Sequence, residues 1–270
     1  MHRWGAANRV TFDPQKEEFI IIRRRNALGP EFRLLGVIFD AQLLMHKGVR
    51  KIAVEAGWRL KSILRSRAYF TTPELMRLYK AHILSYIESG VAGYFHACDS
   101  TLACVDRVQG RFLRAVGLTE EEALLNFRLA PLGTRRCMAI LGFLHRVVLG
   151  LTSTQICELF PLAAANEAGD HISAQVRGVA QKHSKQFIDR INARSSEQMK
   201  RSIFGMIQCY NALPQYIVDG PTVSSFEGRL QLGVMARVKE GSRDNLQHIF
   251  REGRRYASLL RFQSFFYIEQ

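Results

Sequence analysis

The chain has 270 residues, of which 47% are apolar, so its composition excludes a disordered tail and predicts a folded protein. Lys and Arg outnumber Asp and Glu by 38 to 24, and the resulting formal charge of +14 favours a polyanionic partner over an acidic small molecule. The alternative is a soluble basic protein without such a partner. Residues 1–150 hold 23 basic and 13 acidic side chains, an excess of 10, so we expect a polyanion site in the first half.

The sequence shows no sign of secretion or membrane insertion. Its first five residues, MHRWG, lack the apolar region of a signal peptide, and no run reaches the roughly 18 apolar residues that a membrane span needs. The five cysteines are an odd number without CxxC spacing, which is typical of reduced core thiols rather than of disulfides or a zinc site. We therefore expect an intracellular protein, nuclear or cytoplasmic, that is not embedded in a membrane.

Two segments rich in β-branched or aromatic residues, 17–24 and 32–39, are separated by turn-forming residues at 26–30, which predicts an N-terminal β-hairpin. After Asp40, apolar residues recur at spacings of three and four, as in helices, and no further strand is predicted. The predicted fold class is therefore α+β, mainly α, with one N-terminal β-hairpin, a helical bundle and a helical C-terminal region.

The helical part divides at Gly, Pro and capping residues. Thr72 is the expected cap of a helix with Pro73 in its first position, and the acidic cluster at 120–122 predicts a cap and first helical turn within the connection 118–131. His82 and His145 lie among apolar neighbours, which favours core histidines over ligands. The predicted helices cover about 47–66, 72–89, 101–116, 135–149, 197–211, 222–239 and 243–260, with an exposed helix or a linker at 163–197.

The helix at 47–66 combines an apolar arc with a basic face on the opposite side. Trp58 projects among the basic residues, where its ring could stack on a base or a sugar, whereas the alternative is that it packs beneath a neighbouring helix. Lys and Arg on such a face neutralise backbone phosphates and release counterions, which predicts sequence-tolerant binding. The basic residues of this face are Arg50, Lys51, Lys61 and Arg65.

The helix at 101–116 carries a second basic face, made of Arg107, Arg111 and Arg114. These spacings of four and three bring like charges close together, and their repulsion costs a few tenths of a kcal/mol per pair unless an anion neutralises them. This row of three arginines therefore favours a phosphate partner, and the alternative is a basic face that is simply solvated.

Catalytic motifs are lacking in the sequence. It has no phosphate-binding Gly-rich loop, no nucleophile elbow and no zinc-protease motif, and the eight histidines are scattered. Two-metal nucleotidyl transfer needs clustered carboxylates, but the sequence contains no Asp-Asp pair. We therefore predict no catalytic residue, no metal ligand and no cofactor in this chain.

Four stretches of the sequence occur in a particular order. They are residues 4–19, with Asn8 and a Lys-Glu-Glu run, FRLLGV at 32–37, the helix 72–89 followed by VDRVQGRFLR at 105–114, and NALP at 211–214 with FEGRL at 226–230. Together they resemble the C-terminal portion of non-LTR (LINE-type) retrotransposon reverse transcriptases. The four stretches are similar to the segment after the catalytic Asp-Asp, the primer-grip turn, the thumb with its following helix, and a short C-terminal pattern.

The resemblance implies three parts: the end of a palm with a primer-grip-like hairpin at 1–42, a thumb-like bundle at 43–118, and a helical C-terminal region at 119–270. Leu35, Gly36 and Val37 would form the primer-grip-like turn, and Gly36 would permit it within a hairpin 17–39. The implied partner is an RNA/DNA template–primer duplex. The palm strands that carry the catalytic motif would precede Met1.

The resemblance therefore implies a fragment of an RNA-directed DNA polymerase that is inactive alone. Mg²⁺ is expected only for a complete polymerase. A second partner that the resemblance allows is the missing N-terminal polymerase portion on another polypeptide. Two alternatives stay open: a helical scaffold that binds proteins and has no nucleic-acid role, and an unrelated small enzyme whose site cannot be assembled from the sequence.

Overall fold

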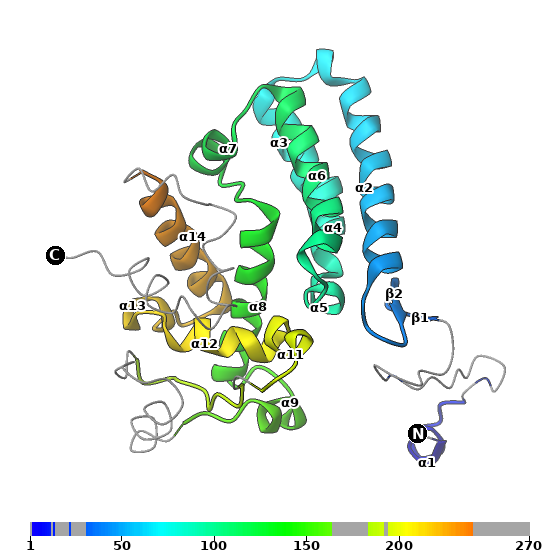
Figure 1. Cartoon of the computed structure of the whole chain (residues 1–270), viewed down its shortest axis with the longest axis vertical. Helices are drawn as coiled ribbons and strands as arrows, with labels where there is room; N and C mark the ends of the chain where they lie inside the picture. Colours follow the sequence, from blue (N-terminus) through cyan, green and yellow to red (C-terminus); the bar gives the residue numbers. More distant parts are fainter. Residues whose placement is uncertain are drawn as a thin grey trace.

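A computed structural model of the chain describes residues 2–11, 13, 22, 31–163, 183–191 and 194–239. These residues form a mainly helical structure with one two-stranded antiparallel sheet, which confirms the predicted fold class (Figure 1). In chain order the elements are α1 (His2–Ala7), β1 (Glu31–Leu34), β2 (Val37–Asp40), α2 (His46–Arg65), the 3₁₀ helix η2 (Arg67–Tyr69), α3 (Thr72–Tyr79), the π-helical turn η3 (Lys80–Leu84), α4 (Ser85–Ser89), α5 (Val91–Tyr94), α6 (Asp99–Val116), α7 (Glu120–Phe127), α8 (Leu132–Val148), α9 (Thr154–Leu159), α11 (Glu197–Arg201), the 3₁₀ helix η4 (Ile203–Gly205), α12 (Met206–Asn211), α13 (Gln215–Val218) and α14 (Val223–Lys239).

The hairpin differs from the prediction. Residues 32–39 are not one strand, because β1 and β2 both lie within 31–40 and are joined at Leu35 and Gly36, with Leu34 paired to Val37. Both turn residues have positive φ, 47° and 87°, which matches the right-handed twist of the flanking strands in a two-residue hairpin. Most of the predicted strand 17–24 and the turn formers at 26–30 lie outside the described residues.

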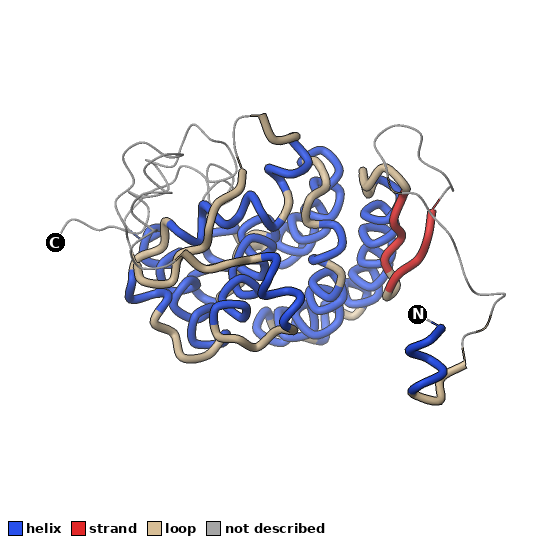
Figure 2. The backbone as a smooth tube through the Cα atoms, turned by 90° about the horizontal axis from the view of Figure 1, so that it is seen from below, coloured by secondary structure: helices blue, strands red, loops and turns tan. Residues whose placement is uncertain are grey.

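Asp40 turns the chain from the hairpin into α2. Its carboxylate accepts hydrogen bonds from the backbone N–H groups of Gln42, Leu44 and Met45, at 3.1, 2.9 and 2.6 Å. Gly48 then lets α2 approach β2, because a Cβ at this position would lie 2.3 Å from the carbonyl oxygen of Ile38. The hairpin is therefore fixed beside the first turn of α2, at the edge of the helical body (Figure 2).

The predicted helix 72–89 is present but contains a π-helical turn, η3, between α3 and α4. Its cap is Thr71 rather than Thr72, because the Glu74 carboxylate accepts from the Thr71 N–H at 2.8 Å and completes a capping box. The prediction of a core histidine at 82 is wrong, since His82 is exposed. By contrast, His145 is fully buried, as predicted.

Helices α2 and α6 run parallel and in contact. Thr101 shares a hydrogen bond with His46 Nδ1 at 2.6 Å, and the Cys104 thiol lies 3.9 Å from the carbonyl oxygen of Val49. Both contacts join residues 55 positions apart, so the two helices run in the same direction with a constant register. Figure 1 shows α2 and α6 side by side, with α3 and α4 returning in the opposite direction. The predicted bounds 47–66 and 101–116 agree with α2 and α6 within two residues.

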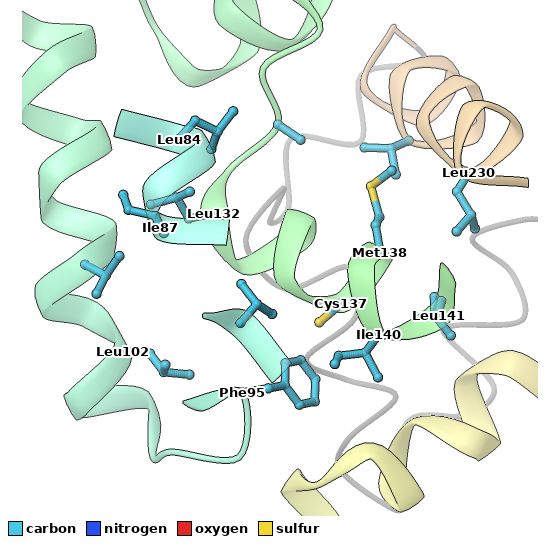
Figure 3. Packing of buried hydrophobic residues seen from close by; sticks show 14 of the residues in the cluster. Leu84, Ile87, Phe95, Leu102, Leu132, Cys137, Met138, Ile140, Leu141 and Leu230 are labelled. Atoms are coloured by element: carbon cyan, nitrogen blue, oxygen red, sulfur yellow. The ribbon is translucent and has the colours of Figure 1, made fainter. Parts of the chain in front are cut away.

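The buried core is continuous from Val37 to Val238. Helix α8 connects its two sides, because it packs against α6 and α5 as well as α12 and α14. Figure 3 shows this arrangement, with Leu102 of α6 on one side of α8 and Leu230 of α14 on the other. The hairpin, the first helices and the C-terminal helices therefore share one core.

Several C-terminal predictions are confirmed and others are refined. The acidic run is the first turn of α7, capped by Thr119, and the helix at 222–239 is α14. The predicted helix 135–149 begins earlier, at Leu132. The segment 197–211 is divided into α11, η4 and α12, because Ser202 between α11 and η4 has extended backbone angles, φ −75° and ψ 179°. The prediction of an exposed helix or linker at 163–197 is wrong for residues 183–191, which are not helical and bury His183, Phe187 and Ile191. Most of the rest of that segment and all of 243–260 lie outside the described residues.

None of the five cysteines forms a disulfide in the described part of the chain. Only Cys137 and Cys209 are buried, so the prediction of core thiols holds for two of them, while Cys98, Cys104 and Cys157 are partly exposed. In the part of the chain that the structure describes, no helix combines the length and the apolar character needed to cross a bilayer.

Candidate nucleic-acid interface

A groove of about 580 Å³ runs between the exposed faces of α2 and α6, and we call it the basic groove. Its α2 wall and its α6 wall both carry residues that the sequence singles out. The lining residues are Arg50, Ala53, Val54, Gly57, Trp58 and Lys61 from α2, and Cys104, Arg107, Arg111 and Arg114 from α6.

The two walls face each other because both helices repeat their exposed residues at spacings of three and four. The parallel register of α2 and α6 then brings these repeats to the same level. Gly57 of α2 lies close to the end of the Arg111 side chain of α6, because a Cβ on Gly57 would lie 3.4 Å from the Arg111 Nη2 atom. With glycine at 57, the guanidinium extends across the groove to the backbone of α2.

Trp58 is 65% exposed. The alternative in which it packs beneath a neighbouring helix is therefore wrong. The Lys61 ammonium lies 5.3 Å from the centre of the Trp58 ring, within the range of a cation–π interaction. Val54 beside it is also 52% exposed. The α2 wall therefore presents a largely exposed aromatic ring next to positive charge.

Within the described residues, no carboxylate forms an ion pair with the cations of the basic groove. Arg50, Lys61, Arg107, Arg111 and Arg114 are all exposed. No Asp or Glu lines the groove. Five cations on two facing helices repel one another, so an anion in the groove would lower the electrostatic energy.

Two of the predicted contact residues lie outside the groove. Lys51 projects from another face of α2, where its ammonium pairs with Glu55 at 3.8 Å. Glu55 also accepts the hydroxyl of Tyr86, and burial together with this hydrogen bond raises the pKa of Tyr86 to about 12. Arg65 is exposed one turn beyond Lys61 and does not line the groove. The structure therefore brings together six of the eight predicted residues.

The predicted primer-grip-like residues do not form one surface. Leu35 is 97% exposed at the tip of the hairpin, and Gly36 supplies the positive φ of the turn. Val37 is 8% exposed and faces inward, where its Cγ2 atom would lie 3.1 Å from a Cβ on Gly90. Only the turn itself can touch a ligand, and Val37 anchors it to the helices.

A second hollow, of about 510 Å³, lies near Cys98 between the start of α2, the start of α6 and α11. Burial raises the pKa of the Cys98 thiol, but hydrogen bonds from Ser100 and Thr101 outweigh burial and the net pKa is lowered. His46 contacts Thr101 rather than the thiol. His96 also lines this hollow, but its Nε2 atom lies 3.0 Å from the Leu43 carbonyl oxygen, so neither histidine is hydrogen-bonded to the thiol.

Sequence reasoning missed the groove's small residues, Ala53 and Gly57, whose spacing of four is a signal for close helix approach. In chemical terms the groove can bind a polyanion that also carries planar rings. Within the described ranges, no group of three or more His, Cys, Asp or Glu side chains could hold a metal ion.

Comparison of the chain with models of protein families, with curated proteins and with solved structures finds no match.

Proposed function

We propose that the chain binds nucleic acid through the basic groove, as the thumb-like part of a retroelement reverse transcriptase. One observation carries the proposal: six residues chosen from the sequence for nucleic-acid binding line a single groove that contains no carboxylate. Exposed cations without internal partners gain most from phosphates, because binding releases the condensed counterions of the nucleic acid. The order of the LINE-like stretches along the chain supports the choice of a template–primer duplex as the ligand.

The proposed function is binding and not polymerisation. Nucleotidyl transfer requires carboxylates that hold two metal ions, and the sequence contains no Asp-Asp pair to supply them. In the proposal, catalysis needs the N-terminal polymerase portion, and Mg²⁺ belongs to that portion. The exposed hairpin tip at Leu35 and Gly36 would lie against the primer terminus.

Salt dependence of the affinity tests the proposal. The dissociation constant of the full chain for an RNA/DNA hybrid duplex is measured over a range of salt concentrations. Five cations line the groove, so if each neutralises one phosphate, the logarithm of the association constant should fall against the logarithm of salt concentration with a slope of about −4 to −5. A slope near zero, or the absence of binding to any duplex, contradicts the proposal and favours a helical protein-binding scaffold.

A further inference from the structure

The basic groove has one feature that contact with a duplex backbone does not require, namely a largely exposed aromatic ring. Trp58 is 65% exposed and lines the groove, and the Lys61 ammonium lies 5.3 Å from the centre of its ring. A duplex offers phosphates and groove edges to a protein, whereas its base faces are covered by the adjacent bases of the stack. An exposed indole surrounded by cations is therefore better matched to an unpaired base.

The spacing of the two helices also favours a single strand over a duplex. Two helices in contact have axes about 8–10 Å apart, whereas even the major groove of a duplex is about 12 Å wide. A whole duplex can therefore contact the exposed cations from outside, but it cannot bring a base into the groove between α2 and α6. A single strand is narrow enough to enter, with its phosphates toward one wall and its bases toward the other.

We propose that the basic groove takes a single-stranded segment of nucleic acid, with an unpaired base stacked on Trp58 and the adjoining phosphates held by Arg107, Arg111 and Arg114. This inference rests on the proposed function and specifies its substrate. The preferred ligand is a nucleic acid with an unpaired stretch next to its duplex. The two walls have different roles, since α6 supplies three arginines and α2 supplies the ring together with Arg50 and Lys61.

The chain permits a direct optical test, because Trp4 and Trp58 are its only tryptophans. A full-length Trp4→Phe variant leaves Trp58 as the sole tryptophan, whose fluorescence is excited at a wavelength that tyrosine does not absorb. The variant is titrated with a single strand, a blunt duplex, and the same duplex with a single-stranded overhang. Stacking on a base should quench Trp58 with the first and third ligands and leave it nearly unchanged with the blunt duplex.

Affinity measurements provide a second test of the single-strand inference. A Trp58→Ala variant should bind the single strand and the overhang duplex about tenfold more weakly, in line with the contribution of one base–aromatic stack. Its affinity for the blunt duplex should stay within about twofold of the wild type. Trp58→Phe, which keeps a stacking surface, should recover most of the loss. Because Trp58 is exposed, these substitutions leave the core intact.

The possible outcomes separate this inference from the proposed function. Equal quenching by blunt and overhang duplexes, or binding of every ligand without quenching, overturns the single-strand inference while the groove stays a nucleic-acid site. Failure to bind any nucleic acid overturns both. Quenching confined to ligands with unpaired bases, with a matching loss in Trp58→Ala, supports both.

Discussion

The guanidinium of Arg136 on α8 holds the carboxylate of Asp106 on α6 through two hydrogen bonds of 2.6 and 3.0 Å. The Arg136 side chain is 6% exposed, and that of Asp106 is 33% exposed. This paired geometry fixes the rotation of α6 relative to α8. Asp106 immediately precedes Arg107, so the same contact orients the arginine wall of the basic groove.

Removal of the Asp106 carboxylate should destabilise the fold. Asp106→Ala leaves the Arg136 charge buried without its partner, and because Asp106 is partly exposed we expect a loss of about 2–3 kcal/mol in the free energy of unfolding. Urea denaturation measures the loss. A double variant, Asp106→Ala with Arg136→Met, removes both charges and should recover a large part of it. If the single and double variants are equally unstable, the ion pair is not the cause.

Two glycine substitutions should have opposite effects. Gly48→Ala would place a Cβ 2.3 Å from the Ile38 carbonyl oxygen, so the hairpin must move away from α2 at a cost of about 1–3 kcal/mol. Gly110→Ala is the matched control on α6, because a Cβ there meets nothing within 4 Å. This control should stabilise the helix by about 0.5–1 kcal/mol. Thermal unfolding of both variants checks the pair, and equal effects would contradict the close contact of α2 with β2.

Acidification should unfold the C-terminal side of the molecule through His183. Burial lowers the pKa of His183 to about 4, and the positive charge of Lys185 adds to this effect, while the hydrogen bond to the Tyr210 carbonyl opposes it. The Nδ1 atom accepts the Lys185 N–H, so a second proton on the ring would break that hydrogen bond. The unfolded state, with an ordinary pKa near 6.5, binds the proton first. Stability is therefore complete above about pH 6.5 and falls as the pH drops toward 4, by up to about 3 kcal/mol.

A variant isolates this contribution from the others. Burial lowers the pKa of His145 as well, and burial raises the pKa of Asp189, whose effect on stability has the opposite sign. The informative quantity is therefore the difference between the wild type and His183→Gln, measured by urea denaturation from pH 7 to 4. Gln keeps the donor to Tyr210 but does not titrate. An unchanged pH dependence in His183→Gln would show that His183 is not the sensitive group.

Local periodicity was sufficient to predict α2 and α6, because each keeps one apolar arc over several turns. It was not sufficient for the hairpin, since the turn depends on a positive φ at Leu35, a residue that rarely adopts it. Nor could it separate His82 from His145. Both have apolar neighbours in sequence, but only His145 is covered by distant segments, through hydrogen bonds to Tyr210 and Gly220.

The candidate site shows the same limit. The exposed cations of each helix follow from a helical wheel, but the facing of the two walls depends on the parallel contact of α2 and α6, which joins residues 55 positions apart. Lys51 illustrates the error that results. It is adjacent to Arg50 in sequence and basic, yet a rotation of one residue takes it to a different face, beside Glu55.

Charge reversal of one groove wall tests the central claim most directly. A triple variant, Arg107→Glu, Arg111→Glu and Arg114→Glu, is compared with a control that has the same charge change on exposed residues elsewhere, Arg67→Glu, Arg77→Glu and Arg146→Glu. Affinity for an RNA/DNA hybrid with an overhang is measured at constant salt. The groove variant should bind at least about 100-fold more weakly and the control only severalfold, because nearby charges act more strongly than distant ones under screening. Equal losses in the two variants would contradict binding in the basic groove.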